Sequence, residues 1–228
     1  MRRTIIILLS LIPLFAMAQE PQVIGGYLLD GNDSFEELDA AVLDESKSKE
    51  KNLDNKGMKI PGGCIAMNPR SVGTEIGSLV HTKQPFLVKT ISFTVDENRM
   101  EGCKGSIRIY RLNAEGNPEN IVTMPILQDI PKAEKKTTFR IAPQESIVLE
   151  PGEYYISFSL TEISAGIMDR WVDSDTWAEK DRSTRYMEDR IFFPLYVKTS
   201  YTRKDADAPL SKWSANIGIA VRGIERKQ

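Results

Sequence analysis

The side chains that could do chemistry are few, beginning with the single histidine, His81. A nucleophilic hydrolase needs a serine or cysteine beside a base, and the sequence has no Gly-x-Ser-x-Gly elbow. His81 lies in "SLVHTKQPF", at the expected end of a strand, with no partner for a catalytic triad nearby. Paired carboxylates serve glycoside hydrolases, but 32 acidic residues make some pair unavoidable. We therefore expect no catalytic residue, no enzymatic activity and no cofactor.

Four acidic side chains crowd together in one charged stretch. They are Asp169, Asp173, Asp175 and Glu179. Oxygen-rich loops can hold calcium, but this spacing does not match an EF-hand. The basic residues interleaved with them are Arg170, Lys180, Arg182 and Arg185. We expect a solvated, charge-balanced surface and no metal ion.

The chain has two cysteines, Cys64 and Cys103. In an exported protein they can pair, and a disulfide closing a loop of about 40 residues would raise the free energy of the unfolded state by ~4 kcal/mol. Two buried free thiols are the alternative. A structural zinc needs four ligands, which these two and His81 cannot supply. We favour the disulfide.

Aromatic residues offer the remaining candidate site, consisting of Trp171, Trp177, Tyr186 and Trp213. Flat aromatic faces stack against sugar rings, and neighbouring Asp and Arg side chains could hydrogen-bond the hydroxyls. Alternatively, these tryptophans close one end of the fold and belong to its core, because tryptophan is highly buried on average. Both interpretations stay open at this point.

The first eighteen residues, "MRRTIIILLSLIPLFAMA", have the form of a signal peptide. Arg2 and Arg3 precede an apolar run that is shorter than the roughly 20 residues needed to span a bilayer, and Ala16-Met17-Ala18 fits signal peptidase. We expect cleavage before Gln19 and a periplasmic or extracellular protein. No later run is apolar enough for a membrane span.

The charge of the chain argues against nucleic acid as a partner. Loss of Arg2 and Arg3 changes 30 basic residues to 28 against 32 acidic ones, a net charge of about −4. Nucleic-acid binders gain affinity by neutralising phosphates and usually show a basic excess. The sequence shows neither an excess nor a basic stripe.

Residues 19–61 and residues 62–225 differ in composition. The first segment is charged and poor in aromatics, so we expect a largely flexible lead-in. The second alternates apolar and polar side chains with a period of two, as in "PFLVKTISFTVDEN". Pro125 interrupts one such run, which predicts an edge strand or a bulge.

The stretch "IVLEPGEYYISFSL" predicts a hairpin with a central strand. Pro151 and Gly152 suit a type II turn. The side chains that follow on one face are Tyr154, Ile156, Phe158 and Leu160. About eight or nine such strands, separated by Gly, Pro and Asn, predict an all-β fold, an antiparallel β-sandwich or jelly roll. A long insertion at 164–190 interrupts it, and loops of that length are often functional.

The runs "FLVKTISFTVDENRMEGCKGSIRIYRLNAEGNPENIVTMPI", "IVLEPGEYYISFSL", "PLYVKTSY" and "SKWSANIGIAVRG" together resemble an uncharacterised secreted β-sandwich module of Bacteroidota. The resemblance covers roughly Gly73 to Gly223. It implies a fold and a compartment, and it implies no reaction. Such modules often follow a carboxypeptidase-regulatory-like domain, which the segment before Pro61 does not match.

Two functions from different classes fit these observations. The first is an exported, non-catalytic binding or interaction module that presents loops, and their aromatics, to a glycan or a cell-surface protein. The second is a structural accessory subunit of a cell-envelope assembly, held by an edge strand or by the lead-in, with no small ligand.

Overall fold

The computed structural model describes residues 49–53, 57–178, 184, 187–205 and 208–225. The chain divides into two compact units, Met1–Glu45 and Ser46–Gln228, and the described residues all belong to the second. The expected signal peptide, most of the lead-in, Glu179 and Tyr186 lie outside the described residues.

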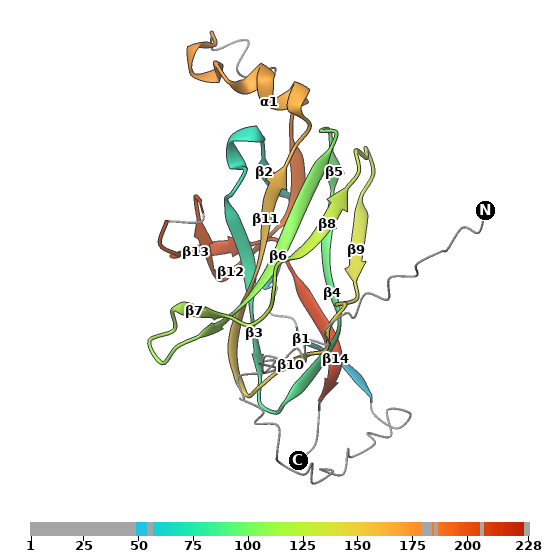
Figure 1. Ribbon diagram of the computed structural model, residues 1–228, viewed down its shortest axis with the longest axis vertical. Coiled ribbons are helices and arrows are strands. Elements are labelled where there is room, and N and C mark those ends of the chain that lie inside the picture. Colours follow the sequence, from blue (N-terminus) through green and yellow to red (C-terminus); the bar gives the residue numbers. More distant parts are fainter. Residues whose placement is uncertain (1–48, 54–56, 179–183, 185–186, 206–207, 226–228) are drawn as a thin grey trace, which may run out of the picture. The chain divides into compact units, whose positions relative to one another are not determined.

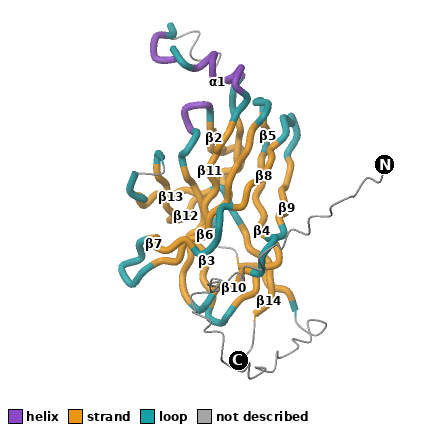
Figure 2. The backbone as a smooth tube through the Cα atoms, in the orientation of Figure 1, coloured by secondary structure: helices purple, strands orange, loops and turns teal. Residues whose placement is uncertain are grey.

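Two antiparallel sheets pack against each other as a β-sandwich, which confirms the predicted fold class (Figures 1 and 2). The smaller sheet has the order β1-β14-β4-β10, and β9 also pairs with β4. Its strands are β1 (Glu50–Leu53), β4 (Phe86–Val95), β9 (Thr137–Ile141), β10 (Ile147–Leu149) and β14 (Ala220–Glu225).

The larger sheet has the order β13-β12-β3-β11-β6-β7, with β2 and β5 paired to β12 and β8 paired to β6. Its strands are β2 (Met58–Met67), β3 (Glu75–Thr82), β5 (Glu97–Asn98), β6 (Cys103–Leu112), β7 (Pro118–Ile121), β8 (Ile126–Ile130), β11 (Gly152–Glu162), β12 (Ile191–Arg203) and β13 (Ser211–Asn216). The helices that the described residues contain in full are η2 (Pro69–Ser71), α1 (Ala165–Trp171) and η3 (Ser174–Thr176). Within the described ranges, no helix has the length and apolar character needed to cross a membrane.

The described residues form fourteen strands rather than the predicted eight or nine. Two of them, β1 and β2, begin before residue 62, the start expected for the sandwich. The register of β1 on β14, from Glu50 opposite Ile224 to Leu53 opposite Val221, explains this, because pairing across the sheet can order a strand that buries little of its own surface. Pro125 lies between β7 and β8, which pair in succession with β6 at the sheet edge, so the predicted edge position is confirmed.

The strand β11 lies at the centre of the larger sheet, as predicted, and is buried on both faces. The predicted hairpin is not formed, because β10 pairs with β4 in the smaller sheet. On the inner face the ring of Phe158 lies 5.1 Å, between centroids, from the rings of both Phe93 and Phe193. On the outer face Tyr155, Ser157 and Ser159 are buried too. The two-residue alternation indicates one core face of this strand and does not reveal that the second face is covered.

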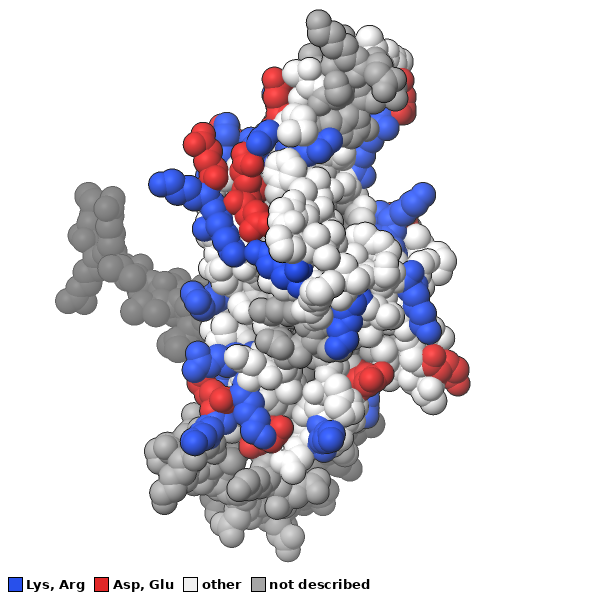
Figure 3. All heavy atoms as spheres, turned by 180° about the vertical axis from the view of Figure 1, so that it is seen from behind, with Lys and Arg blue, Asp and Glu red and all other residues white. Residues whose placement is uncertain are grey.

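Charges of both signs are distributed over the surface. On the face seen in Figure 3, Lys and Arg side chains are interspersed with Asp and Glu side chains. The whole chain carries a formal net charge of −2.

Both cysteines are free, so the disulfide favoured from the sequence is not formed. Cys64 is exposed on β2, opposite Pro194 of β12. Cys103 is buried at the start of β6, with its Sγ 3.8 Å from Asn98 Oδ1. The two residues lie on strands that do not pair, and residue spacing could not reveal this.

This arrangement predicts very different reactivities for the two thiols. Burial raises the pKa of the Cys103 thiol to about 11, although the hydrogen bond to Asn98 acts against this. About one molecule in a thousand would then carry the thiolate at Cys103 near pH 8. Iodoacetamide labelling followed by peptide mass spectrometry should therefore show rapid modification of Cys64, and modification of Cys103 only after unfolding in urea. A Cys64→Ser variant is the control, and it should lose the rapid phase. Equal labelling rates in the native protein would contradict this prediction.

Candidate functional site

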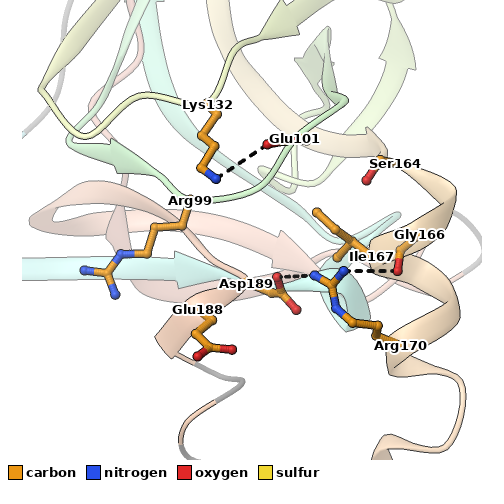
Figure 4. A pocket seen from close by; sticks show the side chains of 9 residues that line it. All are labelled: Arg99, Glu101, Lys132, Ser164, Gly166, Ile167, Arg170, Glu188 and Asp189. Carbon is orange, nitrogen blue, oxygen red and sulfur yellow. Dashed lines mark hydrogen bonds and ion pairs between the residues drawn. The ribbon is translucent and has the colours of Figure 1, made fainter.

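A cavity of about 420 Å³ opens where the insertion leaves the sandwich (Figure 4). Its wall consists mostly of polar and charged side chains. The nine lining residues, of which only Gly166 and Ile167 lack a polar or charged side chain, are Arg99, Glu101, Lys132, Ser164, Gly166, Ile167, Arg170, Glu188 and Asp189. Four segments that are far apart in the sequence supply them: the β5–β6 loop, the loop after β8, α1 with its first preceding residue, and the residues before β12.

Backbone hydrogen bonds tie these four segments together. Asn98 and Ala133 exchange two hydrogen bonds of 2.8 Å, which places the loop carrying Lys132 beside β5. The buried Asn98 side chain donates to Ile130 O at 3.0 Å. The Arg99 N–H donates to Arg190 O at 2.8 Å, which fixes the residues before β12. The cavity is thus built on strand ends held in place by the sheet.

The start of the insertion is fixed by a close approach of two backbones. The Ser164 N–H donates to Glu101 O at 3.1 Å. Beside it, Gly102 has φ +66°, and a Cβ there would lie 3.1 Å from Ser164 N. Only glycine adopts this left-handed conformation without strain in so little space. Gly102 therefore allows α1 to start directly beside the cavity.

The charges in the wall balance, three cationic side chains against three anionic ones. Arg170 Nη2 lies 2.9 Å from Asp189 Oδ1, and Lys132 Nζ lies 3.5 Å from Glu101 Oε1 (Figure 4). Arg99 is held outside this set, because it donates to Glu97 at 2.6 Å and to Met187 O at 2.6 Å. The nine wall residues therefore carry no net formal charge, and Glu97 adds one negative charge beside Arg99, just outside the wall.

Two polar groups in the wall keep hydrogen-bonding capacity for a ligand. Glu188 is exposed and forms no ion pair with any described residue. Ser164 precedes α1, but its hydroxyl does not cap the helix. A carboxylate accepts hydrogen bonds, and a hydroxyl both donates and accepts.

The aromatic candidates among the described residues do not form an exposed stacking surface. Trp171 is buried, with Nε1 donating to Asp189 Oδ2 at 2.8 Å. Trp177 is half-buried and meets the Trp171 ring edge-on, with centroids 5.0 Å apart. Trp213 is half-buried on β13, and this strand lies well away from α1 in Figure 1. Tyr186 is outside the described residues. Trp171 thus holds the wall residue Asp189 by a hydrogen bond and does not present its ring face to the cavity.

The insertion is also tied to the body of the sandwich on its far side. Arg70 of η2 donates to Ser174 Oγ at 2.7 Å and forms an ion pair with Asp175. Asp175, one of the acidic residues of the insertion, therefore pairs with an arginine of the sandwich. Within the part of the chain that the structure describes, no group of three or more His, Cys, Asp or Glu side chains could hold a metal ion.

Sequence reasoning identified the insertion and Trp171, but it missed most of the cavity wall. Arg99, Glu101 and Lys132 follow strand ends and carry no motif that distinguishes them from other surface charges. Their only sequence signal is their position next to predicted turns. Their convergence depends on β5, β6 and β8 meeting at one end of the larger sheet.

The fold and the cavity define an antiparallel β-sandwich with a charge-lined recess at one end. No protein-family model and no curated protein matches the chain. Among solved structures, it is similar to the infectious bursal disease virus Gt strain, at 8% identity and a TM-score of 0.36, and to the Gx strain, at 11% and 0.31. Each alignment covers 78% of this chain, and the chain spans about a third of the viral chains, 33% and 32%. These values carry no inference about function.

Proposed function

We propose that this protein is an exported, non-catalytic binding module whose end cavity takes a neutral, hydroxyl-rich ligand, with a glycan as the leading class. The observation that carries the proposal is the charge-balanced wall, with three cationic and three anionic side chains around about 420 Å³. A neutral recess of this kind favours a ligand without net charge, because a strongly charged ligand would face like charges on part of the wall.

The chemistry of the wall suits hydroxyl groups. Carboxylates such as Glu188 accept hydrogen bonds from hydroxyls, whereas Arg170 and Lys132 donate to hydroxyl oxygens. The volume lies within the range of about 300–1,000 Å³ that small-molecule sites occupy. Because Trp171 is buried, the sugar would be held by hydrogen bonds instead of ring stacking.

Export rests on the leader "MRRTIIILLSLIPLFAMA" and on the resemblance to secreted Bacteroidota modules. A binding role is supported by the position of the cavity on loops at one end of a rigid sandwich, where recognition residues concentrate.

The test is a glycan array on the chain without residues 1–18, followed by calorimetric titration of the ligands that bind. Glu188→Gln should weaken binding about tenfold or more, because a hydrogen bond to a charged group contributes about 1.5–3 kcal/mol. Ser164→Ala should weaken it less, since its hydroxyl is uncharged.

The matched control is Glu145→Gln. Glu145 is an exposed carboxylate in the β9–β10 loop, and β10 lies toward the end of the sandwich away from α1 (Figure 1). This variant should bind like the unaltered chain. A clean negative array, or equal losses for Glu188→Gln and Glu145→Gln, would rule out sugar binding in the cavity.

A further inference from the structure

The outer face of the larger sheet carries several small residues at its centre. In the register of β3, β11 and β6, Glu75, Ser159 and Ser106 form one row, and Gly77, Ser157 and Arg108 form the next. A Cβ on Gly77 would overlap the carbonyl oxygen of Ile156, so this position accepts only glycine. The small residues leave room for long side chains to lie flat across the sheet.

Two arginines, Arg108 and Arg203, lie over these small residues, and both contact the buried carboxylate of Glu75. Arg108 Nη1 lies 2.6 Å and Arg203 Nη2 2.7 Å from Glu75 Oε1. Tyr110 OH lies 3.1 Å from both Glu75 oxygens. Two guanidinium groups against one carboxylate leave the cluster with one positive charge in excess.

The excess charge reaches the surface at Arg108. Its side chain is 25% exposed, whereas the Glu75 side chain is fully buried. Arg108 Nε has no hydrogen-bond partner among the described residues, and the same holds for the buried hydroxyls of Ser106 and Ser157 beneath it. Because Nε is itself buried, a partner can reach Arg108 only at the exposed part of its guanidinium group.

Exposed apolar side chains line this cluster along the sheet edge. Ile121 of β7 lies opposite Tyr110, and Leu127 of β8 lies opposite Ser106, so both are on the face that carries Arg108. They are 56% and 68% exposed. Met124, in the interruption between these strands, is 79% exposed. Large apolar side chains grouped in this way typically mark an interaction site.

We propose that this face docks a partner protein through an extended segment that brings a carboxylate to Arg108 and apolar side chains onto Ile121, Met124 and Leu127. Charge complementarity selects an acidic segment, because one more carboxylate would neutralise the cluster. Arginine, tyrosine and methionine are enriched in protein interfaces, where arginine and tyrosine often contribute most of the binding energy. The edge strand β8 also has backbone groups on its outer side that an added strand could pair with.

This inference goes beyond sugar binding, and the two sites share no residue. It gives the accessory-subunit hypothesis a defined surface. The occupant is a different protein, because the charge at Arg108 calls for an acidic segment and for no feature particular to a second copy.

The test uses an array of extended ten-residue peptides in which one Asp or Glu is placed among Leu, Ile and Val, each beside a copy with Asn or Gln at the acidic position. Binding to the chain without residues 1–18 is measured by fluorescence polarisation. Acidic peptides should bind at least about tenfold more tightly than their neutral copies, since a charge-assisted hydrogen bond contributes about 1.5–3 kcal/mol. Higher salt should reduce this preference.

Leu127→Ser and Met124→Ser should weaken every bound peptide, and they should fold normally because both side chains are exposed. Arg108→Gln should remove the preference for acidic peptides. Glu188→Gln, in the cavity, should change nothing, which separates this site from sugar binding. Absence of any acid-selective peptide would overturn the proposal. So would dimerisation in analytical ultracentrifugation that Leu127→Ser abolishes, because the occupant would then be a second copy.

Discussion

Replacing Glu75 by glutamine is expected to lower the free energy of unfolding by about 3–5 kcal/mol. The change removes the negative charge that holds Arg108 and Arg203, whose side chains are mostly buried, and leaves two guanidinium groups facing each other. Taking a charge out of water without a partner is costly, and Glu75 is fully buried, so solvent cannot take over its role. Urea denaturation followed by circular dichroism gives the value directly.

The matched control is Glu162→Gln. Glu162 forms an ion pair with Lys104 on the same sheet, but their side chains are 60% and 48% exposed. Exposed pairs of this kind contribute about 1 kcal/mol or less. A similar small loss for both variants would show that water reaches Glu75. A double-mutant cycle with Arg108→Met should give a coupling energy well above that of the Glu162–Lys104 pair, because buried charges interact more strongly.

Phe158→Ala is expected to destabilise the fold by a similar amount, about 3–5 kcal/mol. Phe158 is fully buried on the central strand β11, where its ring contacts Phe93 and Phe193. Its ring also fills the space above Gly105, where a Cβ would overlap it. The truncation leaves a cavity between the two sheets that the neighbouring strands cannot close without breaking their hydrogen bonds.

Thermal and urea unfolding measure this loss, with Val172→Ala as the control. Val172 is 77% exposed after α1, so its truncation should change stability by no more than about 0.5 kcal/mol. A loss below about 1 kcal/mol would contradict this prediction, because it would mean that the interior of the sandwich collapses around the missing ring.

The candidate site was predictable only in part, because its residues converge through strand order. The length and charge of the insertion at 164–190 marked it as a place to look, and α1 does form one wall of the cavity. The role of Trp171 could not be predicted, since an amphipathic indole suits both a sugar platform and a core position. Its hydrogen bond to Asp189 decided between them, and this bond joins α1 to the short segment that precedes β12.

What the sequence determined by itself is the class of fold and the inner face of its central strand. A two-residue alternation of apolar and polar side chains specifies a strand and one buried face, whatever surrounds it. Only the tertiary structure decided that Ser157 and Ser159 are also buried, that Cys64 and Cys103 stay apart, and that β1 joins the smaller sheet. Each of these depends on which strand lies next to which. Pairing energy comes from contacts across the sheet, and local sequence carries no record of the neighbour.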